Sequence, residues 1–305
     1  MKRTILFVNI CLFLTTIAFA QNRWIPIFGY ENMEIRSIAM NKDGKFIAVT
    51  EKGILCDGIF TELMYDSYEV VIDNKECIFA RTKYGVFRSE DNGAQWTLSI
   101  SSQQVPMPAQ IEKCFTIDSE NKIFFYSYYL YESIDQGKTW NQVNIAPVRR
   151  MAIDPNTKTI LTTYWNTWFK SVNGAKSWKE IESPGTAQEI DITANGNIVF
   201  TPNTFYENAL HLSSDKGNTW VTRNKGLPKS PTGQLPKVNV MITHKNDVFL
   251  GTDYSGVYQL ENGSESWKYL NRGLAATKIN CLLHYKGHLY AGTDRGIWEL
   301  KMSDQ

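Results

Sequence analysis

Four acidic residues could supply a catalytic pair of carboxyls if the fold brought two of their side chains together. Glu51, Glu207, Asp253 and Asp294 each lie in a loop that we expect after a short apolar strand. A glycoside hydrolase needs two carboxyls, at about 5.5 Å for retaining or roughly 6.5–9.5 Å for inverting chemistry. Spacing along the chain does not set these distances, so the elements that carry the acids decide whether a pair exists.

Other catalytic and metal-binding patterns are weak. His284 and His288 are four residues apart, but they flank the hairpin sequence Tyr285-Lys-Gly287 rather than one helix face, and no third ligand accompanies them. There is no glycine-rich phosphate loop between a strand and a helix, and no nucleophile elbow. We therefore expect no metal site and no cofactor.

An aspartate recurs in an eight-residue phrase, S-x-D-x-G-x-x-W. Each copy offers one carboxylate, fewer oxygens than a calcium loop supplies. Asp and Ser can bond to backbone groups of a turn, Gly can adopt a positive φ, and Trp can bury a large face. We therefore expect a structural phrase that closes a hairpin. Its full copies are Ser89, Asp91, Gly93 and Trp96; Ser133, Asp135, Gly137 and Trp140; and Ser213, Asp215, Gly217 and Trp220.

The copies recur at a nearly constant interval. Two weaker copies run from Ser171 to Trp178 and from Leu260 to Trp267, so the copies start at 89, 133, 171, 213 and 260. An interval of about 40 to 45 residues, filled with short alternating strands and turns, is typical of propeller blades. The sequence predicts an all-β, seven-bladed β-propeller of four-stranded blades.

The last blade lacks a fourth strand of its own. Blade seven ends near Leu300, after strands at 279–285, 288–293 and 296–300. Residues 24–28, Trp-Ile-Pro-Ile-Phe, have the Trp-opened character of a fourth strand and precede blade one. We predict that this N-terminal strand completes blade seven and closes the ring, which protects the edges of the array.

The first twenty residues resemble a secretory signal. Lys2 and Arg3 precede an apolar run, and Ala18-Phe-Ala20 is an A-x-A cleavage site. We expect cleavage after Ala20, a single propeller domain over residues 21–305, and a secreted or periplasmic location. No later stretch approaches the roughly 18 apolar residues that a membrane-spanning helix needs.

The net charge bears on the partners of the protein, and the cysteines bear on its disulfides. The formal net charge is +1, and it becomes −1 without Lys2 and Arg3. A near-neutral chain with no run of Lys or Arg argues against nucleic-acid binding. We also expect the protein to be a monomer. The four cysteines of the expected domain form no C-x-x-C pair, so they are either buried small hydrophobes or disulfide partners. They are Cys56, Cys77, Cys114 and Cys281.

The phrase resembles the Asp-box, or BNR, repeat of sialidases, sortilin-type receptors, xyloglucan hydrolases and photosystem II assembly factors. The resemblance covers about residues 24–300. Sialidases carry an Arg-Ile-Pro element, whereas this chain reads Arg23-Trp-Ile-Pro26 with a Trp inserted. Xyloglucan hydrolases are similar to two such propellers with a cleft between them. The resemblance therefore predicts the fold but does not choose among these functions.

The resemblance also implies where a ligand would bind, because Asp-boxes lie on one face of such propellers and ligand sites on the other. Aromatic residues gather in the second-to-third-strand loops of blades three to five, with charged residues on either side. Such a surface suits a sugar or a peptide, or its rings simply pack against one another. We expect a non-catalytic module that binds a glycan or an envelope or extracellular protein. The alternatives are a glycoside hydrolase or polysaccharide lyase, and an assembly scaffold. The candidate ligand-binding residues are Arg81, Tyr84, Tyr128, Tyr164, Trp165, Tyr206, Asp253, Tyr254, Asp294 and Arg295.

Overall fold

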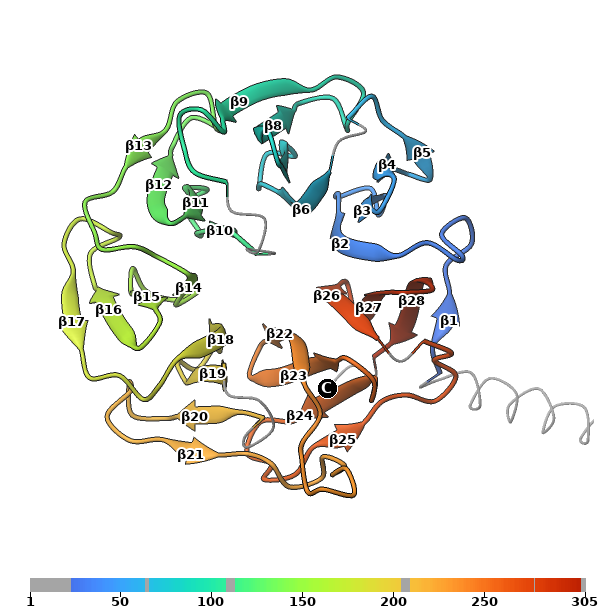
Figure 1. Cartoon of the computed structure of the whole chain (residues 1–305), viewed down its shortest axis with the longest axis vertical. Coiled ribbons are helices and arrows are strands. Elements are labelled where there is room, and N and C mark those ends of the chain that lie inside the picture. The colour runs from blue at the N-terminus through green and yellow to red at the C-terminus, as the bar shows by residue number, and fades with distance from the viewer. Residues whose placement is uncertain (1–22, 64–65, 108–112, 204–208, 277, 303–305) are drawn as a thin grey trace, which may run out of the picture.

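The chain folds into seven four-stranded antiparallel sheets arranged around a central axis (Figure 1). This computed structural model describes residues 23–63, 66–107, 113–203, 209–276 and 278–302. The described residues are all strand, turn or loop, and each sheet is one blade of a β-propeller. The predicted signal at residues 1–20 lies outside the described residues. Among those that are described, no helix is long and apolar enough to cross a membrane.

The first four blades follow the chain in order. Blade one contains β2 (Ile35–Met40), β3 (Phe46–Thr50), β4 (Gly53–Cys56) and β5 (Ile59–Phe60). Blade two contains β6 (Ser67–Ile72), β7 (Ile78–Thr82), β8 (Gly85–Ser89) and β9 (Thr97–Ser101). Blade three contains β10 (Phe115–Ile117), β11 (Ile123–Ser127), β12 (Tyr129–Ser133) and β13 (Asn141–Gln142). Blade four contains β14 (Arg150–Ile153), β15 (Ile160–Tyr164), β16 (Thr167–Ser171) and β17 (Lys179–Ile181).

The remaining blades keep the same order, except that the last one takes a strand from the other end of the chain. Blade five contains β18 (Ala187–Ile192), β19 (Ile198–Pro202), β20 (His211–Ser213) and β21 (Val221–Thr222). Blade six contains β22 (Val238–His244), β23 (Asp247–Thr252), β24 (Val257–Leu260) and β25 (Lys268–Tyr269). Blade seven contains β26 (Ile279–Tyr285), β27 (His288–Thr293), β28 (Gly296–Lys301) and β1 (Ile25–Pro26).

Ring closure occurs as the sequence predicts. β1 pairs antiparallel with β28, with Ile25 opposite Glu299. Trp24 is buried, its backbone N–H donates to the carbonyl of Arg272, and its indole N–H donates to the carbonyl of Leu270. Trp267 makes the same two bonds to blade five, with the carbonyls of Lys225 and Arg223. Trp24 thus occupies in blade seven the position that the repeated Trp occupies in blade six.

The core lies between neighbouring blades. The second strand of a blade is sandwiched between two others, so β3, β7 and β11 are buried along their whole length. Their β-branched and aromatic side chains suit this two-sided environment. The four cysteines of the domain are free thiols, three of them buried, and none joins a disulfide.

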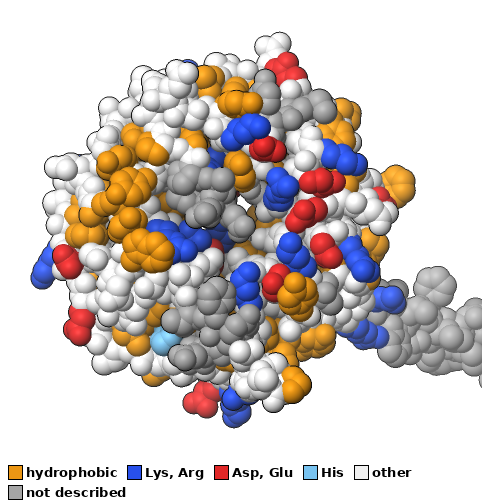
Figure 2. Space-filling model, viewed as in Figure 1, with side chains coloured by type: hydrophobic (Ala, Val, Ile, Leu, Met, Phe, Trp, Pro, Cys, Tyr) orange, Lys and Arg blue, Asp and Glu red, His pale blue; other side chains and the backbone are white. Residues whose placement is uncertain are grey.

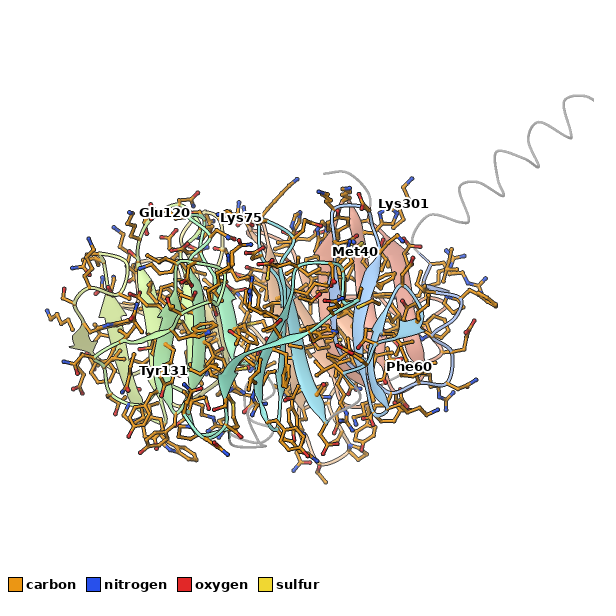
Figure 3. All side chains as sticks on the ribbon, turned by 90° about the horizontal axis from the view of Figure 1, so that it is seen from above. Met40, Phe60, Lys75, Glu120, Tyr131 and Lys301 are labelled. Atoms are coloured by element: carbon orange, nitrogen blue, oxygen red, sulfur yellow. The ribbon has the colours of Figure 1, made fainter. Side chains whose placement is uncertain are left out.

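Antiparallel connection gives the ring two different faces. The turns between first and second strands and between third and fourth strands lie at one end of each sheet, which we call the turn face. Met40, Lys75, Glu120 and Lys301 lie along this side in Figure 3. The second-to-third-strand hairpins and the links between blades lie at the other end, which we call the loop face. The repeated phrase is therefore confined to the turn face.

Within each repeated turn, Ser and Asp bond to the backbone as expected. Ser133 Oγ donates to Asp135 Oδ1 at 2.8 Å and accepts the N–H of Gly137 at 2.8 Å. The same carboxylate accepts the N–H of Thr139 at 2.9 Å. These bonds, with one from the Thr139 hydroxyl, lower the pKa of Asp135 to about 2. The copies that start at Ser89 and Ser213 repeat this pattern, so the aspartates are occupied by their own turns.

Truncating the ring-closing Trp tests its contribution to stability. We expect Trp24→Ala to lower the free energy of unfolding by about 3 kcal/mol or more, because a fully buried indole leaves a cavity. Ile25→Ala, at a neighbouring side chain that is 54% exposed, should cost less than about 1 kcal/mol. Urea unfolding measures both values. A loss below about 1 kcal/mol in both variants would show that the Trp24 side chain is dispensable for stability.

Two equivalent glycines separate packing from backbone strain. A Cβ on Gly137 would lie 2.6 Å from the Phe79 ring, whereas a Cβ on Gly217 would meet its nearest atom at 3.7 Å. Both glycines have positive φ, so both alanine variants carry backbone strain. We expect Gly137→Ala to destabilise the fold by about 1–3 kcal/mol more than Gly217→Ala. Thermal or urea unfolding that ranks the two the other way would contradict this packing.

Candidate functional site

Most second-to-third-strand hairpins on the loop face use a Thr and a Gly. Thr82 Oγ1 donates to the carbonyl of Gly85 at 3.1 Å, and Gly85 has a positive φ of 143°. Blades one, six and seven repeat this arrangement with Thr50 and Gly53, Thr252 and Gly256, and Thr293 and Gly296. Glycine takes the positive φ at no steric cost, so these hairpins form without backbone strain.

Blades three and four break this rule with aromatic residues. Tyr128 has a φ of 78° and Trp165 a φ of 51°, both in the left-handed region. Bulky side chains are uncommon there, because the conformation costs free energy that Gly or Asn avoids. Backbone strain of this kind concentrates at functional sites. The two hairpin tips therefore carry aromatic rings at the expense of local stability.

These rings join two more into one contiguous surface, which we call the aromatic cluster: Tyr128, Tyr129, Tyr164 and Trp165. Neighbouring rings meet edge to face, with centroids 5.0 Å apart for Tyr128 and Tyr129, 5.9 Å for Tyr128 and Tyr164, and 6.4 Å for Tyr164 and Trp165. Tyr128 is 42% exposed and Trp165 55%. Figure 2 shows hydrophobic side chains gathered over this part of the face, whereas charged side chains alternate in sign across the ring.

A cation stands at the edge of the cluster. The guanidinium carbon of Arg149 lies 4.8 Å from the centre of the Trp165 ring. Its Nη1 is buried and has no hydrogen-bond partner among the described residues. Burial, with the neighbouring Arg150, lowers the pKa of Arg149 from its ordinary value. The carbonyl of Tyr128 accepts the N–H of Val148, and the carbonyl of Thr163 accepts that of Arg149, so both hairpins fix this cation beside the rings.

The charges in the central channel are used internally. Lys113 Nζ lies 2.9 Å from Glu189 Oε2 and donates to the carbonyl of Met241 at 3.1 Å. Arg150 Nε lies 3.6 Å from the other oxygen of Glu189. These contacts link blades three, four, five and six across the channel. They engage Lys113 and Arg150 within the channel, whereas Arg149 faces the aromatic cluster.

Two carboxyls with raised pKa values are also structural. Burial raises the pKa of Glu69 to about 7, although its Oε2 accepts the N–H of Cys114 at 2.6 Å and that of Phe115 at 3.2 Å. Burial likewise raises the pKa of Asp191, whose Oδ2 accepts the N–H and hydroxyl of Thr243. Each carboxyl bridges the inner strands of two neighbouring blades.

Three acids of the loop face lie within 4 Å of a lysine. The pairs are Glu34 with Lys278, Asp66 with Lys83, and Asp253 with Lys237.

Some of the predicted ligand-binding residues contact one another in the structure, and others lie apart. Tyr128, Tyr164 and Trp165 come together, and sequence analysis missed the contribution of Arg149. The Arg149-Arg150 doublet at the start of a predicted inner strand was the available signal. Tyr206, with Glu207, lies outside the described residues.

Arg81 does not reach the surface where we expected it. It is fully buried, and its guanidinium stacks 4.6 Å from the centre of the Tyr68 ring. Position 81 is the residue before the hairpin Thr and lies on the buried second strand, which explains its burial.

The other candidates lie in separate blades. Tyr84 packs under Lys83 in blade two, Tyr254 borders a separate cavity of about 570 Å³ near blade six, and Asp253 bonds to Asn239. Asp294 and Arg295 are exposed in blade seven. The structure therefore reduces the candidate surface to the aromatic cluster and Arg149.

Comparison with known proteins identifies the fold. No family model and no curated protein matches the chain. YCF48 bound to D1 peptide superposes with a TM-score of 0.61 at 13% identity, over 93% of this chain and 98% of that one. Virginiamycin B lyase from Staphylococcus aureus gives 0.68 at 10% identity, over 92% and 99%. The fold is that of a seven-bladed β-propeller.

A third similar structure is longer than this chain. The GH74 enzyme of Niastella koreensis gives a TM-score of 0.59 at 15% identity, over 91% of this chain but only 44% of that enzyme. Binding proteins and enzymes thus share the architecture, so the fold alone does not choose a function.

The raised pKa of Glu69 predicts a pH-dependent stability. Because its folded pKa of about 7 exceeds the ordinary 4.5, the folded protein holds a proton that the unfolded chain releases. Its contribution to the free energy of unfolding therefore falls as pH rises from about 4.5 to 7, by roughly 3 kcal/mol. Glu69→Gln should flatten this slope, and Glu180→Gln, at an exposed carboxylate, should leave it unchanged. Urea unfolding across this pH range measures both, and parallel curves for all three proteins would rule the assignment out.

Proposed function

We propose that this propeller is a non-catalytic binding module that holds an extended polypeptide segment against the aromatic cluster and Arg149. The observation that carries the proposal is the strained backbone at Tyr128 and Trp165. Where the hairpins of blades one, two, six and seven use glycine, these two present exposed rings instead. A stability cost that exposes apolar area is explained when a ligand covers that area.

The shape of the cluster favours a polypeptide over a sugar. Edge-to-face packing leaves notches between rings, which suit side chains, whereas a sugar ring stacks on a flat, open ring face. Arg149 already covers one face of Trp165. A cation beside exposed aromatic rings fits a segment in which an acidic side chain stands next to apolar ones. The D1 peptide bound to YCF48, a protein of the same fold, lends support.

An enzymatic role has less support. The glycosidase alternative needs two facing carboxyls, whereas Glu34, Asp66 and Asp253 on the loop face lie close to lysines. The Glu51 carboxylate accepts the backbone N–H of Glu34. Similarity to a GH74 enzyme covers less than half of that protein. Binding of a peptide therefore accounts for the geometry of the face better than hydrolysis or elimination.

The N-terminal sequence supports a proposal for the compartment in which the protein binds its ligand. We propose that residues 1–20 direct export, that cleavage follows Ala20, and that the monomeric propeller meets its ligand in the periplasm or outside the cell. We further propose that the repeated turns are of the Asp-box type. Their Ser and Asp side chains bond within their own turns, which leaves the loop face for recognition.

Asparagine substitution separates binding from folding. Asn tolerates a positive φ, so Tyr128→Asn and Trp165→Asn should change the free energy of unfolding by less than about 1 kcal/mol, because relieved strain offsets lost ring contacts. Both should weaken binding of a peptide selected from a displayed library at least tenfold by fluorescence polarisation, about 1.4 kcal/mol.

Controls decide between the alternatives. Tyr254→Asn removes an exposed tyrosine outside the cluster and should bind like the parent protein. A loss of about 2 kcal/mol of stability in Trp165→Asn, with binding retained, would show that the rings only pack. Retention on a glycan array without peptide binding would favour the carbohydrate alternative, and release of reducing sugar would favour an enzyme.

A further inference from the structure

A large cavity lies on the turn face between blades six and seven. It has a volume of about 880 Å³, within the usual range for small-molecule sites. Phe249, Leu270, Leu300 and Met302 form its apolar wall. His244 and His284 also line it, stacked with ring centroids 3.4 Å apart and planes at 14°.

The cavity lies where blade seven has no turn between its third and fourth strands. In blade three, the repeated turn covers blade two: Gly137 sits on the Phe79 ring, and its carbonyl accepts the Ser99 hydroxyl. Phe79 and Ser99 correspond in blade six to Phe249 and Leu270, three residues before the hairpin Thr and three after the repeated Trp. In blade seven these strands are β28 and β1, from opposite ends of the chain. No hairpin turn joins them over Phe249.

The charges around the cavity favour an anion. Lys245, Lys268, Arg272 and Lys286 line it, against only Asp247 and Glu261. Both acids make contacts within blade six, one of them with the rim lysine Lys268, and Lys286 Nζ donates to the carbonyl of Lys42. Asp247 accepts the side-chain amide of Gln259 and the N–H of Asn262, each at 2.8 Å, and Glu261 pairs with Lys268.

The stacked histidines add an inner wall of low charge. Burial, with neighbouring positive charges that include His244, lowers the pKa of His284 to about 4. Burial lowers the pKa of His244 as well. The two rings are thus neutral and close-packed at neutral pH, and they extend the apolar wall toward the channel.

We propose that this cavity, which we call the closure pocket, binds a small organic anion with an apolar ring or chain. The apolar part lies on Phe249 and Leu270, and the anionic group faces the cationic rim. The site is on the opposite face from the aromatic cluster, so it stands or falls independently of peptide binding.

A fluorescent probe of this chemistry tests the proposal. We expect 8-anilinonaphthalene-1-sulfonate to bind the full-length propeller at a saturable, single site. N-phenyl-1-naphthylamine, which has the same rings without the sulfonate, should bind at least about tenfold more weakly. Arg272→Glu combined with Lys286→Glu should weaken the sulfonate at least tenfold, because the rim loses its positive charge.

Matched variants identify the site. Lys138→Glu combined with Lys176→Glu makes the same change in net charge at exposed positions of other repeated turns and should leave binding unchanged. Unaltered melting temperatures establish that all variants are folded. Equal affinity for the two dyes, or full binding by the Arg272→Glu and Lys286→Glu double variant, would overturn the proposal. Loss of the dye in Trp165→Asn would place it on the loop face, which also overturns it.

Discussion

Ring closure through β1 is the constraint on which the rest of the molecule depends. Each blade buries its two faces against its neighbours, so the first and last blades have open faces unless the circle is complete. The segment from Trp24 to Tyr30 contacts three blades. Trp24 enters the core between blades six and seven, β1 pairs with β28, and Tyr30 packs on Phe46 of blade one at 5.8 Å. A few residues thus make a closed architecture out of a linear series of repeats.

The two faces that the antiparallel connection creates differ in their local structure. On the turn face, the repeated Ser and Asp spend their hydrogen bonds on their own turns, and Gly137 packs on the preceding blade. On the loop face, the hairpin tips differ from blade to blade, and loops of this kind can vary while the core is kept. Both faces hold non-glycine residues with positive φ, but these are exposed rings at Tyr128 and Trp165 and small or polar residues such as Asn92 and Gln136 in the repeated turns.

Much of the architecture could be predicted from the sequence. Because the strand pattern repeats, the strands assigned in one blade can be checked against those of the other blades. The seven blades, the four strands of each and the closing role of Trp24 all followed from period and pattern. Individual strand ends were less certain. The third strand of blade seven was expected at 296–300, whereas β28 runs to Lys301.

The site was harder to predict, because it depends on where blades meet. Arg81 looked like a loop residue, but its strand ends one residue later and it is buried. Arg149 looked like an ordinary strand residue, yet two hairpins from different blades place it over Trp165. Phe249 looked like any core aromatic, yet it also lines a cavity beside the seam between β28 and β1. Each of these facts is a relation between distant segments, which local pattern does not record.

The direction of the closing pair has a mechanical consequence. β1 and β28 are antiparallel, so the residues before Ile25 and those after Glu299 leave the sheet at the same end. Tension between the two ends of the chain therefore loads the β1–β28 bonds one after another, as in opening a zipper, rather than all at once as in shear. The ring gives way to such a pull at its noncovalent seam, while the six other blades stay joined by the chain itself. The seam that completes the fold is thus also the point at which a tethered molecule would yield first.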